Sequence, residues 1–231
     1  AIWKKAGQGS QGINFQLNNL QLNNLGIVYH HEPSATRFSG RTRKTGIKGN
    51  FSGRQFRLRV NSESELKQIN LRKLETDKNL PFICRMEIEK NDSIWIFPDV
   101  SLNVSGLDFI VSGELHTGEM KHLSFNYEGK NLNTRTLLEL LPPQMADRFR
   151  IQRSNGILEL KGHIRGPYGK TTKPESAFSF DFHDAGLVLK NNPLEINRLE
   201  CRGSFSNGEK HSPESGVLSI ESFGADIGSG N

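Results

Sequence analysis

Most of the chain after residue 12 alternates apolar and polar residues with a period of two. In residues 82–89, for example, apolar residues fill every second position and Arg85, Glu87 and Glu89 stand between them. Such alternation is typical of a β-strand with one covered face and one face in water. Strands of this kind belong to antiparallel sheets, because parallel strands are usually covered on both faces. The same pattern recurs in residues 107–116, 122–127, 158–165 and 178–183.

Turn-forming pairs such as Asn91-Asp92, Ser105-Gly106 and Asn207-Gly208 separate these runs. Their spacing is near the 8–12 residues that is typical of consecutive hairpins. We therefore predict about 13–15 short strands. The expected fold is all-β: a long, curled and twisted antiparallel sheet that forms a groove or half-barrel. The alternative is a closed sandwich of two sheets, because an apolar sheet face must be hidden either by curling or by stacking.

One segment, residues 136–150, has helical spacing instead. Leu137, Leu138 and Leu141 are followed by Met145 and Phe149, and two prolines interrupt the segment, so one or two short helices are predicted there. Residues 1–12 are predicted to be a flexible lead-in. Residues 13–231 are predicted to be a single elongated β-domain, with one strand block at 13–130 and a second at 155–231.

Composition agrees with a folded β-protein that has a modest core. Hydrophobic residues make up 34% of the 231 residues, and no stretch reaches the ~18 apolar residues of a membrane-spanning helix. We expect any membrane anchor or export signal to lie outside this sequence. Cys84 and Cys201 both fall on the apolar side of their strands, which favours buried free thiols. The sequence does not decide whether they are bridged, since a bridge depends on their separation in space.

A basic stretch is the most visible candidate for binding. Between Glu32 and Glu63 the chain has no acidic residue, and its basic residues are interleaved with aromatic ones. Three interpretations are open: a solvated sheet face, contact with anionic lipid or polysaccharide, and nucleic-acid binding. Strand alternation favours the first, because it turns the aromatic residues to the core and the cations to water. Contact with an anionic surface is predicted for Lys48, Arg57 and Arg59, and no nucleic-acid partner is predicted.

No residue pattern points to catalysis or to a metal. His30 and His31 are adjacent, so in a strand they point to opposite faces and do not share one ion. A β-scaffold can supply a glycosidase-type carboxylate pair at many positions, but no spacing singles one out. No catalytic residue, metal site or cofactor is therefore predicted, and the protein is predicted not to be an enzyme.

The order of features from Leu137 onward resembles that of the AsmA-like family of bacterial envelope proteins. The resemblance rests first on a short helix at residues 137–142 and on three later strand segments, at 156–167, 178–186 and 217–228. It also rests on an earlier strand, residues 20–29, that ends in a tyrosine. This family is similar to the bridge-like lipid-transfer proteins, which are twisted antiparallel sheets curled into a groove with an apolar lining. Such proteins are usually tethered to the inner membrane by an N-terminal helix and extend into the periplasm.

The resemblance implies a non-enzymatic module of envelope biogenesis that binds or transfers phospholipid or another acyl lipid between the inner and outer membranes. It also implies a periplasmic location in a Gram-negative bacterium, a tether in a segment not present here, and a longer polypeptide of which this chain is a fragment. The alternative function is a β-sandwich carbohydrate-active enzyme or glycan-binding module of the bacterial envelope.

The apolar strand faces have no matching set of amphipathic helices to cover them, so part of this surface is left for the sheet's own curl, another chain or lipid. The residues predicted to line a lipid groove are Phe82, Met86, Leu107, Phe109, Val111, Phe125, Leu160, Phe178, Phe180 and Phe182.

Overall fold

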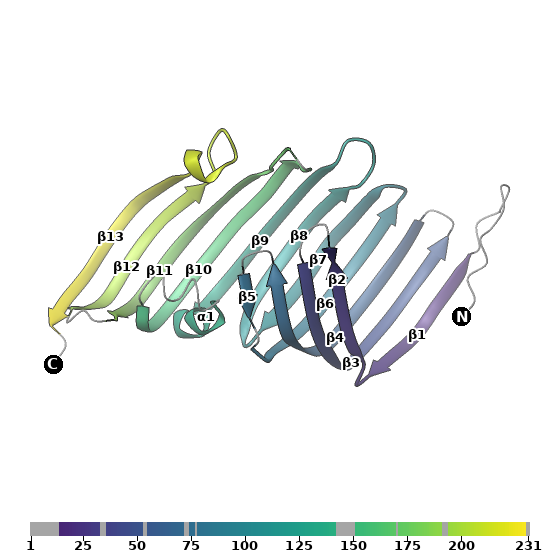
Figure 1. The fold of residues 1–231 in the computed structure, drawn as a ribbon, viewed down its shortest axis with the longest axis horizontal. Helices are drawn as coiled ribbons and strands as arrows, with labels where there is room; N and C mark the ends of the chain where they lie inside the picture. Colours follow the sequence, from purple (N-terminus) through teal and green to yellow (C-terminus); the bar gives the residue numbers. More distant parts are fainter. Residues whose placement is uncertain are drawn as a thin grey trace.

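The fold is known from a computed structural model that describes residues 14–32, 36–52, 55–71, 74–76, 78–141, 151–169, 171–190 and 194–229. Within these ranges the chain forms one antiparallel sheet of 13 strands and one α-helix (Figure 1). No helix in the described ranges has the length and apolar character needed to cross a membrane. The predicted lead-in, residues 1–12, lies outside the described residues.

The first strands in chain order are β1 (Phe15–Asn23), β2 (Gly26–His31), β3 (Thr36–Ser52), β4 (Gln55–Leu71), β5 (Leu74–Thr76), β6 (Leu80–Asn91), β7 (Ile94–Val104), β8 (Leu107–His116) and β9 (His122–Asn133). Helix α1 (Thr134–Leu140) comes next. It is followed by β10 (Ile151–Pro167), β11 (Glu175–Leu189), β12 (Leu194–Ser206), a 3₁₀ turn (Pro213–Ser215) and β13 (Val217–Ser229).

The strands are ordered almost as they occur in the chain. The main path runs β1-β3-β4-β6-β7-β8-β9-β10-β11-β12-β13, while β2 pairs with β3 and β5 with β4. The all-β prediction of a curled antiparallel sheet with a short helix is confirmed. The alternative of a two-sheet sandwich is wrong for the described residues, whose strands all belong to one sheet. The strands are also longer than predicted, since β3, β4 and β10 each have 17 residues.

Register keeps one set of apolar residues on a single face across the whole path. One cross-strand row passes through all eleven strands of the path by direct pairing: Leu20, Ile47, Val60, Met86, Val100, Val111, Tyr127, Gly162, Phe178, Phe205 and Leu218. No residue of this row carries a charge. We call the side of the sheet that this row occupies the apolar face, and the opposite side the polar face.

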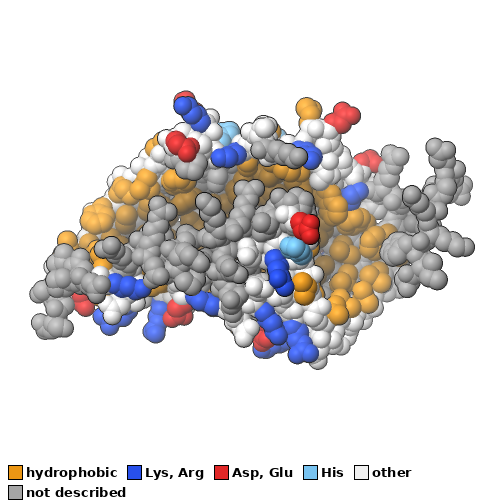
Figure 2. Space-filling model, viewed as in Figure 1, with side chains coloured by type: hydrophobic (Ala, Val, Ile, Leu, Met, Phe, Trp, Pro, Cys, Tyr) orange, Lys and Arg blue, Asp and Glu red, His pale blue; other side chains and the backbone are white. Residues whose placement is uncertain are grey.

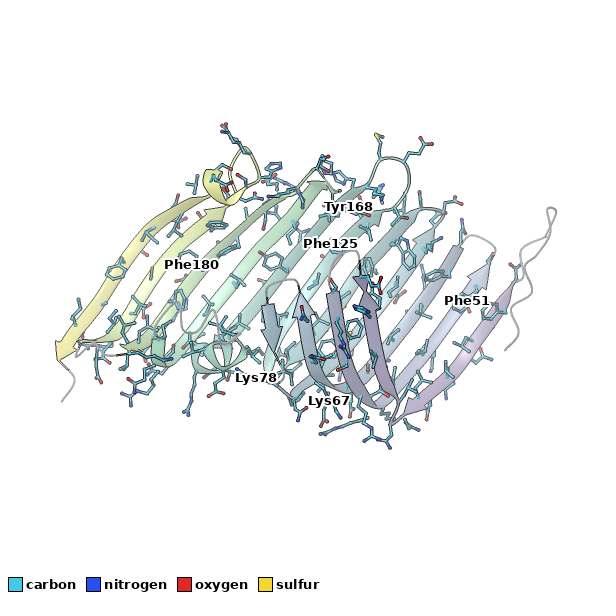
Figure 3. The ribbon with its side chains drawn as sticks, viewed as in Figure 1. Phe51, Lys67, Lys78, Phe125, Tyr168 and Phe180 are labelled. Atoms are coloured by element: carbon cyan, nitrogen blue, oxygen red, sulfur yellow. The ribbon has the colours of Figure 1, made fainter. Side chains whose placement is uncertain are left out.

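The sheet is hollowed on its apolar face. Figure 2 shows hydrophobic side chains gathered in the hollow of the viewed face, with many of the charged side chains along its rim. Phe51, Phe125 and Phe180, which lie far apart along the sheet, belong to this face (Figure 3). A sheet that curls around its apolar face reduces contact with water without a second layer.

The ends of β3 and β4 form a flap over this face, which we define as residues 26–31, 36–42, 64–71 and 74–76. Residues 44–51 of β3 pair with β1, whereas residues 36–41 pair with β2. The change of partner coincides with two register shifts between β3 and β4, one at Ser39/Gly40 and one at Thr42/Lys44. Irregularities of this kind bend a strand and increase its twist. In Figure 1, β2 and β5 accordingly stand in front of the main sheet.

Helix α1 lies at the lower edge of the sheet in Figure 1 and contacts β9 and β10. Its N-cap is Asn133, whose side chain accepts a hydrogen bond from the Thr136 backbone N–H at 3.1 Å. The helix therefore begins two residues before the predicted segment. At its other end, the Lys78 ammonium donates to the carbonyls of Glu139 and Leu141. Any second helix within residues 142–150 falls outside the described residues.

Interior glycines let aromatic rings lie flat on the apolar face. A Cβ at Gly162 would stand 2.6 Å from the Tyr127 ring, and one at Gly203 would stand 2.7 Å from the Phe180 ring. Both positions also have a backbone carbonyl of the next strand within 2.6 Å of that Cβ. Since backbone cannot move aside as a side chain can, these sites require glycine on steric grounds.

We expect Gly162→Ala to lower the free energy of unfolding by about 1–3 kcal/mol, because the added methyl group overpacks against Tyr127 and the Ala177 carbonyl. Gly224→Ala on β13 is the matched control, since no atom lies within 4 Å of its Cβ position. Urea denaturation of both variants measures the difference. Equal stability of the two variants would contradict the packing described here.

Candidate functional site

The ten predicted lining residues all lie on the apolar face. They come from β6, β8, β9, β10 and β11, and pairing aligns them across the sheet. Phe82, for example, pairs with Val104, which pairs with Leu107. Phe109 and Leu160 both pair with Gly129, and Leu160 pairs in turn with Phe180. The structure thus brings the set together, while its role in lipid binding stays a prediction.

Little of the apolar face is sealed from solvent. In the described part of the chain, seven hydrophobic residues are buried: Leu80, Cys84, Val100, Leu107, Leu132, Ala185 and Leu199. Most of the predicted lining residues, such as Phe109 and Phe180, are only half-buried. Toward β13 the face is open, with Leu218 63% and Phe223 67% exposed. The site is therefore a continuous surface rather than a closed cavity.

Aromatic rings form the densest part of this surface. On β11, the ring centroids of Phe178 and Phe180 are 6.4 Å apart, and those of Phe180 and Phe182 are 5.9 Å apart. Phe205 of β12 extends the cluster, with its ring centroid 5.3 Å from that of Phe178. Rings at these separations stabilise one another beyond the area that they bury. They also form an apolar surface on which a flexible apolar chain can pack.

A second aromatic group is only partly predicted by the sequence, whose alternation turns Phe51 and Phe56 to the core but does not connect them with Phe15 and Trp95. It runs along one rim of the hollow, where Phe15, Phe51, Phe56 and Trp95 follow one another on β1, β3, β4 and β7, with neighbouring ring centroids 4.4–5.6 Å apart. Lys90 of β6 lies between Phe56 and Trp95 in the register. Its ammonium stands 5.7 Å from the centroid of the Trp95 ring. Period-two alternation continued beyond Ile88 would have placed Lys90 on the apolar face.

The predicted anionic-surface residues lie on the polar face. Arg57 contacts Glu87 at 3.3 Å and Glu89 at 2.6 Å, and Arg59 contacts Glu87 at 2.9 Å. Lys48 pairs in register with Arg59 and, with both arginines, borders a depression of about 300 Å³. Arg57 and Arg59 therefore meet their counterions on β6, which agrees with a solvated sheet face. Contact with anionic envelope material stays a prediction.

Other ion pairs cover the rest of the polar face. Glu175 accepts hydrogen bonds from Arg165 and His163, which lower the pKa of its carboxyl to about 2. Asp181 pairs with Arg202 at 2.6 Å. Within the described ranges, no group of three or more His, Cys, Asp or Glu residues is placed to hold a metal ion. The arginines described above thus pair with carboxylates on neighbouring strands of this face.

The two cysteines differ in burial. Cys84 is 1% exposed, and burial raises its pKa to about 11. Cys201 is half-buried, and its pKa is raised by burial and by the nearby Asp181 carboxylate. Both thiols are free, and their strands are six places apart in the sheet, about 29 Å at the usual strand spacing. That separation is far too large for a disulfide between them.

Thiol labelling at pH 8 is expected to distinguish the two cysteines. The Cys201→Ser variant, which keeps Cys84, should react only after denaturant is added, because its thiol is buried and protonated. The Cys84→Ser variant should react in the native state, at a slow rate. Fast native labelling of Cys84 would show that the apolar face is not packed as described.

Vesicle binding tests the role of Lys48, Arg57 and Arg59. If the face contacts anionic lipid, an Arg57→Gln/Arg59→Gln double variant should bind phosphatidylglycerol vesicles roughly 30-fold more weakly at low salt, because each charge contributes about 1 kcal/mol. Arg165→Gln, also on the polar face and paired with Glu175, is the matched control. If the wild-type protein does not bind vesicles at any salt concentration, the three residues have a purely structural role.

Comparison with known proteins identifies no relative. No protein-family model matches the chain, and no curated protein and no solved structure is significantly similar to it. The resemblance to the AsmA-like family therefore stays a prediction. What the chain does has to be inferred from its apolar face.

Proposed function

We propose that the chain binds acyl lipid on its apolar face and passes it along the sheet, as a non-enzymatic module of bacterial envelope biogenesis. The observation that supports this proposal most is the uncharged row that crosses all eleven strands of the main path. A lipid tail that moves along this row stays in contact with apolar side chains, because each strand of the path contributes an uncharged residue to the row. Its transfer therefore needs no step through water.

The energetics support the same function. Burying apolar surface is favourable by about 25 cal/mol per Å², so a bound tail and the half-buried rings beneath it both gain from contact. Soluble monomers rarely expose a continuous apolar surface of this extent without using it for binding. The polar face, with its ion pairs between strands, keeps the other side of the same sheet compatible with water.

The dimensions suit a segment of a longer path. Eleven strands at about 4.8 Å give a row of roughly 50 Å when the sheet is followed along its curve. We propose that the chain forms part of a route for phospholipid or another acyl lipid between the inner and outer membranes. In this proposal it lies in the periplasm of a Gram-negative bacterium and is tethered to the inner membrane.

Lipid analysis of protein purified from Gram-negative bacterial cells tests the proposal. Native mass spectrometry should detect bound acyl lipid on the wild type. Phe180→Asp should lose most of it, because a carboxylate in the aromatic cluster is costly beside an acyl tail. Phe109→Asp should act in the same way from β8. Ser179→Asp is the matched control, since Ser179 is exposed on the polar face next to Phe180.

A variant at an exposed position guards against misfolding. Leu218→Asp changes the same row at a side chain that is already 63% exposed, so the fold should tolerate it, as circular dichroism can verify. We expect lipid exchange between vesicles to fall for Leu218→Asp and not for Ser179→Asp. Absence of bound lipid on the wild type, together with no exchange above background, would overturn the proposed function.

A further inference from the structure

Lys90 places a positive charge on the apolar face. Among the residues paired within the described strands, it is the charged residue that the register places on this face. Its cross-strand partners are Phe56 on β4 and Trp95 on β7. It stands one residue before the end of β6, at the rim of the hollow rather than on its floor.

The side chains around Lys90 leave its charge available. Within the described ranges no ion pair joins Lys90 to a carboxylate, and its ammonium rests over the Trp95 ring at 5.7 Å. The nearest acidic residues along β6, Glu87 and Glu89, belong to the polar face and pair with Arg57 and Arg59. A cation–π contact contributes only about 0.5–1 kcal/mol at an exposed site, so it positions the ammonium without neutralising it.

This arrangement has the two parts that an amphiphile requires. Below Lys90 on the same face of β6 lie Ile88 and Met86, which continue into the uncharged row. At the rim, the Lys90 ammonium offers hydrogen-bond donors and positive charge beside the Trp95 ring. If an acyl tail lies on the apolar face along Met86 and Ile88, its headgroup lies near Lys90. Charge complementarity favours an anionic headgroup at this position.

We propose that Lys90, held by Trp95 and Phe56, binds the anionic headgroup of the amphiphile whose acyl tail lies on the apolar face. The headgroup chemistry is phosphate or carboxylate. This inference rests on the proposed function and narrows its substrate class from acyl lipids in general to acidic amphiphiles.

Trp95 provides a direct readout of binding at this rim. The chain has two tryptophans, Trp3 and Trp95, so a Trp3→Phe background leaves the indole that contacts Lys90 as the fluorescent probe. Titrations with oleate and with phosphatidylglycerol test carboxylate and phosphate headgroups. Monoolein and phosphatidylcholine supply matched tails without net charge, and inorganic phosphate supplies the anion without a tail.

We expect both acidic amphiphiles to bind about ten-fold more tightly than their neutral counterparts. Lys90→Gln should reduce this preference to about two-fold or less while binding of monoolein is retained, and Lys90→Glu should reverse it. The control variant Lys161→Gln removes an exposed lysine from the polar face and should keep the full preference. The larger of the two acidic-to-neutral affinity ratios, oleate over monoolein or phosphatidylglycerol over phosphatidylcholine, identifies carboxylate or phosphate as the better headgroup.

Two results would overturn the inference and leave the proposed function standing. One is an unchanged preference for acidic amphiphiles in Lys90→Gln. The other is an equal loss of acidic and neutral ligands in that variant, which would make Lys90 a structural residue. Wild-type protein that binds none of the amphiphiles would overturn the inference and the proposed function together.

Discussion

Cross-strand register is the constraint on which this structure depends. Successive side chains of a strand point to opposite faces, so a slip of one residue between two strands would move a whole apolar set into the polar face. The eleven-strand row is continuous because each pair of neighbouring strands keeps the apolar residues in register. Val111, for example, pairs with Tyr127, and Tyr127 pairs with Gly162. The glycines at the closest approaches support this alignment, since Gly162 and Gly203 admit the rings of Tyr127 and Phe180.

The two faces of the sheet solve different physical problems. The polar face gains from long charged side chains that meet across strands, such as Arg59 with Glu87, although exposed pairs of this kind each contribute little. The apolar face has no second layer of sheet in the described structure. Curling, together with the flap of β2, β5 and the ends of β3 and β4, hides only part of this face. The remaining surface is the basis of the proposed function, and Lys90 is the charged residue that the register of the described strands places on this surface.

Sequence alone predicts the faces well and the long-range geometry poorly. Alternation is local, so the side of the sheet occupied by Phe82, Phe109 or Phe180 can be predicted without knowing any strand partner. The same alternation reaches Lys90, which was overlooked because a lysine after Ile88 resembles the polar end of a strand. The pairing of Arg57 with Glu87 and Glu89 cannot be predicted from alternation, because it depends on which strand lies beside β4. The sequence does not predict the flap either, since the flap arises at register shifts between β3 and β4 rather than at a break in the sequence pattern.

The central claim is that acyl chains contact one face of this sheet and not the other. A photo-crosslinking residue placed at Val111 or at Ile110 in cells tests it directly, because these neighbours on β8 point to opposite faces and Ile110 is 53% exposed. After illumination, mass spectrometry of the purified protein should find acyl-lipid adducts at position 111 and none at position 110. Equal adducts at both positions, or none at either, would contradict the account.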